Sequence, residues 1–444
     1  MKCLIIAAGK GERLANIGCP KPLIKLIGKP LITRIILTAH KLGINDFYVV
    51  TNSEGKKIRT YLDSFSQDKT LRITHLINRE KGKENGVSVL KAKKYLSSED
   101  FLLLMSDHIF DKNILEILLQ SERDSNQVFL AVDYKINNNT MVDLDDVTRV
   151  MVDDQEKIIN IGKDIKEYNA FDTGIFLCSP LIFEALEESI SNGDTTLSGG
   201  LKVLAQKGKV KAVNIEDACW IDVDNELALK KAENYLCQNI KKISDGPVAY
   251  YLNRPISLLL TRWLVRKRII PNQVSVFSFI LSLLGSLFFL LGGYLNLVIG
   301  GILAQISSIV DGCDGEIARL TFQESAFGGW FDAVLDRYAD AFLLFGLTYH
   351  ILGLSWKPSY LWVGFLALIG TYMNSYTADK YDRLMKRKLL IESKKRYFRL
   401  GRDVRIFLVF IGALFNQIFL ILVVLAIITN LENIRRIILC YKQR

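Results

Sequence analysis

Four aspartates stand at regular spacings in a strongly apolar part of the chain. Asp311 and Asp314 close one apolar run, and Asp332 and Asp336 open the next. Residues three or four apart share a face of a helix, so two neighbouring helices would bring the four carboxylates to one point. An ionised aspartate at the centre of a membrane span costs about 2.5–3.5 kcal/mol, so the group needs cations or water. Clustered carboxylates suit Mg²⁺, Mn²⁺ or Ca²⁺, which can hold a pyrophosphate.

The residues between these aspartates are small or charged in a fixed pattern. From Asp311 to Asp336 the chain reads D-x2-D-G-x2-A-R-x8-G-x3-D-x3-D. Small residues such as Gly315 and Gly328 allow a helix or a nucleotide backbone to approach closely. A polar clamp between helices and an ion-conduction path are the alternative interpretations.

The pattern resembles the signature of the CDP-alcohol phosphotransferase family, and the similarity covers residues 250–440 and includes Pro271-Asn272. It implies that Asp336, close to the metals, is the general base on the acceptor hydroxyl. The implied metal ligands are Asp311, Asp314, Asp332 and Asp336, and the implied CDP-binding residues are Asn272, Asp311, Gly315 and Arg319.

The N-terminus carries a second candidate site. Leu4–Leu14 reads as a strand followed by a Gly-rich loop, whose backbone N–H groups can cradle phosphates while Lys10 and Arg13 add charge. Such a loop alone is weak evidence, and an ordinary strand–turn–helix is the alternative. A lysine, Lys21, follows the loop, and carboxylates that end or follow later apolar segments are Asp107, Asp222 and Asp224.

In this order the segments resemble nucleotidyltransferases over about residues 1–235, and cytidylyltransferases that make CDP-inositol in particular. The resemblance implies that Arg13 and Lys21 are catalytic and that Asp107 holds Mg²⁺ with Asp222 or Asp224. The implied CTP-binding residues are Ala8, Gly9, Gly11, Arg13, Lys21, Asn85, Gly86 and Ser88. Glu12 stands where many relatives have a small residue.

The order of the two halves resembles the bifunctional family that makes di-inositol phosphate phosphate. The resemblance implies that CTP and inositol-1-phosphate give CDP-inositol, from which a second inositol-1-phosphate displaces CMP. Candidates for binding substrate phosphate are Lys163, Arg383, Arg402 and Arg405. For the three arginines the alternative is flank charge that reaches toward the membrane surface.

The elements that must position these residues fall into two classes. Residues 1–240 alternate short apolar runs with amphipathic stretches, which predicts a Rossmann-like, doubly wound α/β domain with a mostly parallel sheet. Residues 241–255 have the Gly and Pro of a linker, and residues 256–270 read as an amphipathic helix in the membrane interface. Residues 271–444 predict an all-α bundle of six spans: Asn272–Gly292, Tyr294–Arg319, Gly328–Leu352, Pro358–Asp382, Arg402–Phe415 and Gln417–Ile438.

The formal charge of +10 is concentrated in basic clusters beside the apolar segments. This is typical of cytoplasmic membrane flanks, and it predicts a multi-pass protein of the cell membrane with both termini and the first domain on the cytoplasmic side. The clusters adjoin spans and no nucleic-acid motif occurs, so we expect no nucleic-acid partner. Seven cysteines without a CxxC pair predict neither zinc nor disulfides. We expect no cleavable signal peptide, because Met1–Ala8 has no basic region of any length.

The expected partners are therefore CTP, inositol-1-phosphate, CDP-inositol and the lipid bilayer, with Mg²⁺ or Mn²⁺ in both sites. On resemblance alone we expect a homodimer. Two other functions remain open at this point. A phospholipid synthase would join the CDP-activated head group to a lipid acceptor, and a nucleotide-sensing first domain would leave only the membrane half catalytic.

Overall fold

A computed structural model describes residues 1–9, 13–14, 18–67, 70–80, 83–121, 126–137, 139–240, 246–384 and 401–442, with residues 382–384 described by their backbone alone. The described chain divides into two compact units, Met1–Tyr235 and Leu236–Arg444. All of the described strands lie in the first unit, and the second is built from helices.

Nine strands of the first unit form one sheet, in the order β10-β9-β11-β6-β1-β4-β5, with β8 and β12 joined beside β11. The strands are β1 (Lys2–Ala7), β2 (Lys25–Leu26), β3 (Lys29–Pro30), β4 (Asp46–Asn52), β5 (Arg72–Asn78), β6 (Phe101–Met105), β7 (His108–Phe110), β8 (Val128–Asp133), β9 (Arg149–Val152), β10 (Ile158–Gly162), β11 (Ala170–Cys178), β12 (Val210–Asn214) and β13 (Trp220–Asp222). Strands β6, β1, β4 and β5 are parallel, whereas β11 pairs antiparallel with β6.

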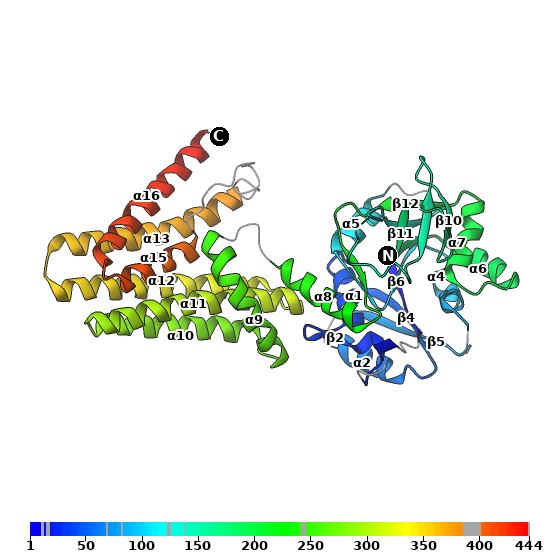
Figure 1. Ribbon diagram of the computed structural model, residues 1–444, viewed down its shortest axis with the longest axis horizontal. Helices are drawn as coiled ribbons and strands as arrows, with labels where there is room; N and C mark the ends of the chain where they lie inside the picture. The colour runs from blue at the N-terminus through cyan, green and yellow to red at the C-terminus, as the bar shows by residue number, and fades with distance from the viewer. Residues whose placement is uncertain are drawn as a thin grey trace. The chain divides into compact units, whose positions relative to one another are not determined.

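Helices cover both faces of this sheet, because side chains of its buried strands alternate between two cores. The helices are η2 (Lys21–Leu23), α1 (Leu31–His40), α2 (Lys56–Ser66), α3 (Asn85–Leu90), α4 (Lys93–Leu96), α5 (Lys112–Gln120), α6 (Leu181–Ser191), α7 (Leu197–Gln206) and α8 (Glu226–Gln238). Ile5 of β1 packs in the core that includes α1 and α5, and Leu4 packs in the core that includes α6 and α7. Figure 1 shows these two pairs of helices on opposite sides of the sheet. The prediction of a doubly wound α/β domain is confirmed.

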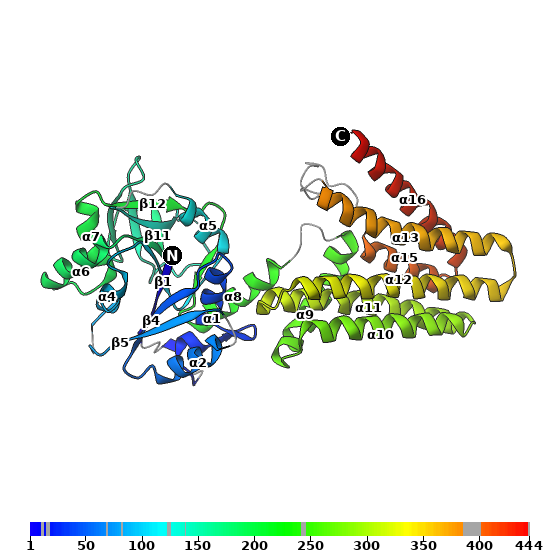
Figure 2. The same cartoon turned by 180° about the vertical axis from the view of Figure 1, so that it is seen from behind.

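The second unit is a helical bundle, in which most of the long helices run alongside one another while the last one is inclined to them (Figure 2). Its elements are η3 (Ala249–Asn253), α9 (Arg254–Arg266), α10 (Pro271–Leu290), α11 (Tyr294–Thr321), α12 (Ala326–Leu354), α13 (Pro358–Leu384), α15 (Arg402–Leu414) and α16 (Ile418–Lys442). Each of the six predicted spans overlaps one of the helices from α10 to α16.

Three of the described helices, α10, α11 and α16, are long and apolar enough to cross a membrane. Helix α15 has 13 residues and is therefore about 20 Å long, against about 30 Å for a hydrocarbon core. The count of six spans therefore stays a prediction.

The amphipathic helix α9 begins at Arg254 rather than at Ile256, and it is fixed to α11 by a buried carboxylate. Glu316 is fully buried and accepts hydrogen bonds from Arg254 at 2.6 Å, Ser257 at 2.6 Å and Thr261 at 2.7 Å. Three donors for one carboxylate offset the cost of removing its charge from water. On the N-terminal side of α9, Asp403 of α15 accepts from the backbone N–H of Ala249.

Candidate active sites

In the first unit, an acidic cluster forms at the carboxyl ends of two neighbouring strands. Strands β1 and β6 are parallel neighbours, so the loop after β1 and Asp107 after β6 lie at the same edge of the sheet. Lys21, from η2, places its Nζ 2.6 Å from Asp107 Oδ2 and 3.6 Å from Asp222 Oδ1, and it also bonds Asp224. The structure thus brings together the lysine and all three carboxylates that the sequence singled out.

The pKa values of Asp222 and Asp224, the two carboxylates that come later in the chain, shift in opposite directions. Burial lowers the pKa of Lys21, but the three carboxylates outweigh it and hold the pKa above its ordinary value. Burial raises the pKa of Asp222, yet His108 and Lys21 reverse this and leave it below the ordinary value. The pKa of Asp224 is raised, by burial first and then by the nearby charge of Asp222. Asp222 is therefore the better of the two candidates for a cation ligand.

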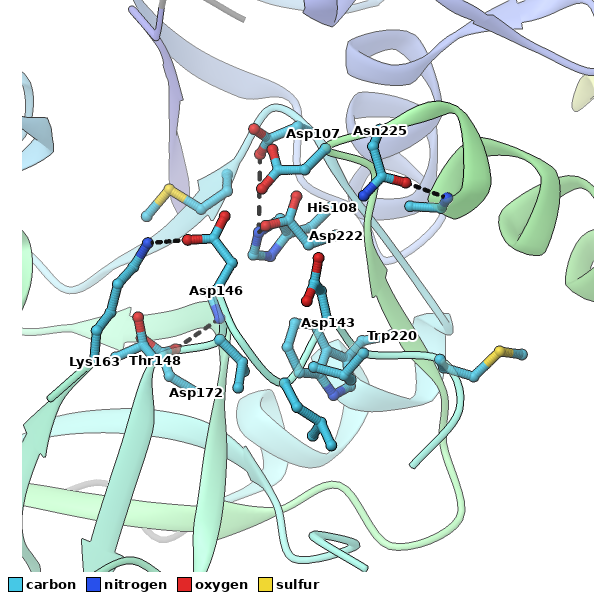
Figure 3. A pocket seen from close by; sticks show the side chains of 18 of the residues that line it. Asp107, His108, Asp143, Asp146, Thr148, Lys163, Asp172, Trp220, Asp222 and Asn225 are labelled. Atoms are coloured by element: carbon cyan, nitrogen blue, oxygen red, sulfur yellow. Dashed lines mark hydrogen bonds and ion pairs between the residues drawn. The ribbon is translucent and has the colours of Figure 1, made fainter. Parts of the chain in front are cut away.

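His108 is a member of the cluster that the sequence interpretation missed. Strand β13 pairs with β7 so that Asp222 stands opposite His108, and His108 Nε2 lies 3.5 Å from Asp222 Oδ2 and 3.9 Å from Asp107 Oδ1 (Figure 3). Its Nδ1 lies 2.7 Å from the carbonyl of Thr173, so Nδ1 donates to this carbonyl and Nε2 points toward the two carboxylates. Burial lowers the pKa of His108, but Asp222 and Asp107 raise it to about 9. A lone histidine directly after an aspartate was the only signal in the sequence.

A fourth carboxylate joins the cations on either side of this cluster. Asp146 lies 2.5 Å from Arg13 NH1 and 2.5 Å from Lys163 Nζ. It therefore bridges Arg13, which is expected to bind the triphosphate of CTP, and Lys163, which is expected to bind the phosphate of the other substrate. Because Lys163 and then Arg13 outweigh burial, the pKa of Asp146 is held below its ordinary value. Figure 3 shows the Asp146–Lys163 pair, and the sequence interpretation did not include Asp146.

Two adjoining cavities of about 590 and 550 Å³ meet at this bridge. The smaller is lined by Gly9, Arg13 and Lys21, and the larger by His108, Asp172 and Trp220. Both share Asp107, Asp146 and Lys163, among other residues. Two cavities with a common acidic and basic wall can hold two phosphorylated molecules whose reacting groups meet there.

Of the other residues predicted to bind CTP, the structure places some at the cavities and others away from them. Asn85 lines both cavities, and its side chain also accepts from the backbone N–H of Leu197. Gly86 is required by packing, since a Cβ there would lie 2.7 Å from two backbone oxygens. Ser88 is buried and its hydroxyl accepts from Asn78, so the structure does not bring it to either cavity. Ala8 follows β1 and precedes Gly9, and Gly11 lies outside the described residues, as do Lys10 and Glu12.

In the second unit, three of the four aspartates form a compact ligand set. Oxygens of Asp311, Asp314 and Asp332 all lie within 4.8 Å of one another. Two serines of α10 orient the first two: Ser275 donates to Asp314 and Ser278 to Asp311. Sequence spacing did not identify these serines.

The carboxylate of Asp332 tests whether these residues fit a metal ion. Asp332 Oδ1 is buried without a hydrogen-bond partner among the described residues. A buried carboxylate oxygen that has no donor needs a cation, and three carboxylates converging within one coordination sphere fit a divalent metal. The residues present therefore fit the metal that the pattern predicts.

The fourth aspartate faces an arginine from another helix. Arg402 NH1 lies 2.7 Å from Asp336 Oδ1 and 2.9 Å from Asp311 Oδ2. Its Nε lies 3.0 Å from Asp340, which also bonds Arg405 NH2 at 3.0 Å. The structure thus brings two of the three arginines predicted for the acceptor phosphate to the acidic cluster, together with Asp340, which was not predicted. The side chain of Arg383 lies outside the described residues.

The predicted CDP residues lie along one side of the motif. Asn272 is the second residue of α10 and lies beside Gly328, where a Cβ would lie 3.4 Å from the Asn272 amide oxygen. Arg319 lies against Gly315, so a Cβ at Gly315 would lie 2.9 Å from Arg319 NH1. Any side chain at position 315 would force this guanidinium to move.

Both halves of the chain match known families. Residues 3–153 match the family model of the MobA-like NTP transferase domain, and residues 268–432 match that of CDP-alcohol phosphatidyltransferase. The chain is also similar to a solved structure of the inositol-1-phosphate CTP transferase from T. maritima, at 23% identity and a TM-score of 0.47, over 52% of this chain and 94% of the other.

Curated relatives extend over the whole chain. The bifunctional IPC transferase and DIPP synthase of Aquifex aeolicus is 34% identical over 99% of this chain and 98% of its own length. The protein of the same description from Thermococcus kodakarensis is 33% identical over 97% and 94%. The archaetidylinositol phosphate synthase of Pyrococcus horikoshii is 34% identical over 38% of this chain and 82% of its own length.

Proposed function

The chain belongs to the family of bifunctional IPC transferases and DIPP synthases, and on that premise we propose that it makes CDP-inositol and then consumes it. It is a bifunctional transferase, with a nucleotidyltransferase half and a CDP-alcohol phosphotransferase half. The observation that carries the proposal is that each half holds its own carboxylate cluster with a cationic side chain inside it, Lys21 in one and Arg402 in the other.

In the first reaction, a phosphate oxygen of inositol-1-phosphate attacks the α-phosphorus of CTP. The bond between the α-phosphorus and its bridging oxygen breaks, and pyrophosphate leaves. We assign CTP to the smaller cavity, which Arg13 and Lys21 line, and Lys163 lies on the wall that both cavities share. These cations offset the repulsion between the two anionic substrates and hold them in line.

In the second reaction, a hydroxyl oxygen of another inositol-1-phosphate attacks the phosphorus of CDP-inositol that carries the inositol. CMP leaves, and the product is di-inositol phosphate phosphate. Asp336 takes the hydroxyl proton, and Arg402, in contact with Asp336, receives the acceptor's phosphate.

Enzymes of both families generally use divalent metals, and both clusters have acidic groups that could bind one. We assign Mg²⁺ or Mn²⁺ to Asp107 and Asp222 in the first site, and to Asp311, Asp314 and Asp332 in the second. When bound, the cation neutralises phosphate charge and stabilises the leaving group.

Three long apolar helices and the phosphotransferase half indicate a membrane protein. The proposal extends this to six spans in the cytoplasmic membrane, with both termini and residues 1–240 on the cytoplasmic side, and to a homodimer. We place the linker between the halves within residues 241–255, before α9 begins at Arg254.

The direct test is to incubate the purified chain with CTP, Mg²⁺ and inositol-1-phosphate and to follow the phosphorus NMR spectrum. The expected result is CDP-inositol and pyrophosphate, followed by a phosphodiester that also carries a phosphomonoester, and CMP. Formation of neither CDP-inositol nor the diester would reject the proposal. A parallel reaction in lipid vesicles tests the phospholipid alternative, which predicts that label from CDP-inositol enters the lipid fraction.

A further inference from the structure

We propose that Asp340 is a positioning residue that orients Arg402 and Arg405 to receive the phosphate group of the acceptor. The inference rests on the proposed function of the membrane half. It adds a residue outside the D-x2-D-G-x2-A-R-x8-G-x3-D-x3-D pattern, one helical turn beyond its last aspartate.

The first observation is that the two carboxylate oxygens of Asp340 accept from two different arginines. Oδ1 accepts from Arg402 Nε at 3.0 Å, and Oδ2 accepts from Arg405 NH2 at 3.0 Å. The two arginines stand three residues apart in the first turn of α15, so their like charges lie close together. A carboxylate placed between them removes this repulsion and fixes both side chains at once.

The second observation is burial. Asp340 is 5% exposed and Arg405 is 4% exposed, so this ion pair is shielded from water. Buried charge pairs have a defined geometry because neither partner can turn to solvent instead. The orientation of Arg402 is therefore set by Asp340 on its Nε side.

The third observation is where the oriented guanidinium reaches. With Nε on Asp340, Arg402 places NH1 between Asp311 and Asp336. The guanidinium thus connects the proposed general base to a residue of the metal set. A hydroxyl that is to lose its proton to Asp336 must come within reach of the same arginine.

The fourth observation is that Arg405, which shares Asp340 with Arg402, has a further hydrogen-bond donor available. Arg405 Nε is buried and has no hydrogen-bond partner among the described residues. Arg402, Asp340 and Arg405 together carry a charge of +1, and Asp311 and Asp336, which also contact Arg402, are the carboxylates assigned to the metal and to the acceptor's proton. An anion with several oxygens matches both the charge and the unused donor, and the phosphate of inositol-1-phosphate is such an anion.

The test is Asp340→Asn in the full chain, assayed by CMP release from supplied CDP-inositol with inositol-1-phosphate. The amide keeps the shape of the carboxylate, but it carries no charge and only one of its two terminal atoms can accept a hydrogen bond from an arginine. We expect the KM for inositol-1-phosphate to rise about 10- to 100-fold, since hydrogen bonds between charged groups are involved. The KM for CDP-inositol should stay within about twofold. Inorganic phosphate, used as an inhibitor competing with the acceptor, should lose affinity by a similar factor, and Asp340→Glu should recover part of it.

A matched control is available on α16, where Glu432 also holds two arginines, Arg435 at 2.8 Å and Arg436 at 3.1 Å. Glu432→Gln removes a comparable charge pair away from the acidic cluster, and it should leave both KM values unchanged. If Asp340→Asn changed both KM values equally, or left phosphate inhibition as in the wild type, the positioning role would be wrong. If instead the wild-type chain released no CMP from the two supplied substrates, the proposed function would fail and not this inference.

Discussion

Lys21 Nζ and Asp107 Oδ2 lie 2.6 Å apart although 86 residues separate them along the chain. The parallel pairing of β1 with β6 produces this contact, because it brings the segments that follow both strands to one edge of the sheet. The pair joins the residue proposed to bind the triphosphate to the residue proposed to bind the metal.

Replacing Lys21 by Met should therefore abolish the first reaction and spare the second. Removing a cation positioned at the reacting phosphates costs about 100- to 1000-fold in rate. The measurement is pyrophosphate release from CTP and inositol-1-phosphate, compared with CMP release from supplied CDP-inositol. Lys25→Met, at an exposed position of β2, is the control. Pyrophosphate release at the wild-type rate in Lys21→Met would remove Lys21 from the catalytic group.

Replacing Asp336 by Asn should have the opposite effect. The amide cannot take the acceptor's proton, so diester formation should fall by about 100- to 10,000-fold while CDP-inositol accumulates. Phosphorus NMR of the complete reaction distinguishes the two products. Asp379→Asn, at an exposed aspartate of α13, is expected to behave as the wild type. Diester formation at a normal rate would show that another group takes the proton.

His108 should contribute a nitrogen ligand to the metal of the first site. Metal-bound histidines commonly donate their other ring N–H to a carbonyl, as His108 does to Thr173. The compact set of the second site, Asp311, Asp314 and Asp332, offers only oxygens, so nitrogen coupling to bound Mn²⁺ in pulsed electron paramagnetic resonance would report the first site alone. We expect this coupling in the wild type and in His40→Gln, and its loss in His108→Gln. Coupling that survives in His108→Gln would assign the nitrogen to another residue.

The raised pKa of Asp172 predicts that the local stability of β11 depends on pH. Burial raises the pKa of Asp172 to about 6, although a hydrogen bond from Gly174 and the charge of His108 oppose the shift. The folded chain therefore binds this proton more tightly than the unfolded chain, and stability falls as the pH rises from about 4 through 6. Ionised Asp172 costs on the order of 3 kcal/mol at pH 7. Asp172→Asn should remove this cost.

Hydrogen exchange of the β11 peptide, corrected for intrinsic rates, measures the effect. Asp172→Asn should exchange more slowly than the wild type at pH 7, and the difference should disappear near pH 4. Asp154→Asn, in an exposed turn, serves as the control. Faster exchange of Asp172→Asn at pH 7 would mean that the ionised carboxylate stabilises β11.

The buried pair of Arg254 and Glu316 predicts strong coupling between two substitutions. Arg254→Met alone leaves a buried carboxylate without its cation, and it should lower the stability of the membrane half by about 3–5 kcal/mol. The double variant with Glu316→Leu should be more stable than Arg254→Met. Thermal unfolding in detergent measures both, and additive effects of the two substitutions would contradict the coupling.

The parts of the fold and sites that the sequence predicted are those with short-range signals. The four aspartates could be found because helical spacing places them on common faces, and Gly9 and Asp107 because both follow apolar strands. Asp340 follows Asp336 by one helical turn, but its partners Arg402 and Arg405 are 62 and 65 residues away, and nothing local indicates the pairing. The same holds for Asp146, which is 133 residues from Arg13. Helices α3 and α4 are separate because the N–H groups of Lys91 and Ala92 bond carbonyls three residues back, which the apolar pattern does not indicate.

The attachment of α9 to α11 determines where a chain of this kind can be cut or joined. All three donors to Glu316 lie between Arg254 and Thr261, upstream of the first long membrane helix. A gene that began after Thr261 would encode a membrane half with a buried carboxylate and none of these donors. We therefore expect a membrane half cut ahead of Arg254 to keep all three of these donors, and one cut after Thr261 to lose them.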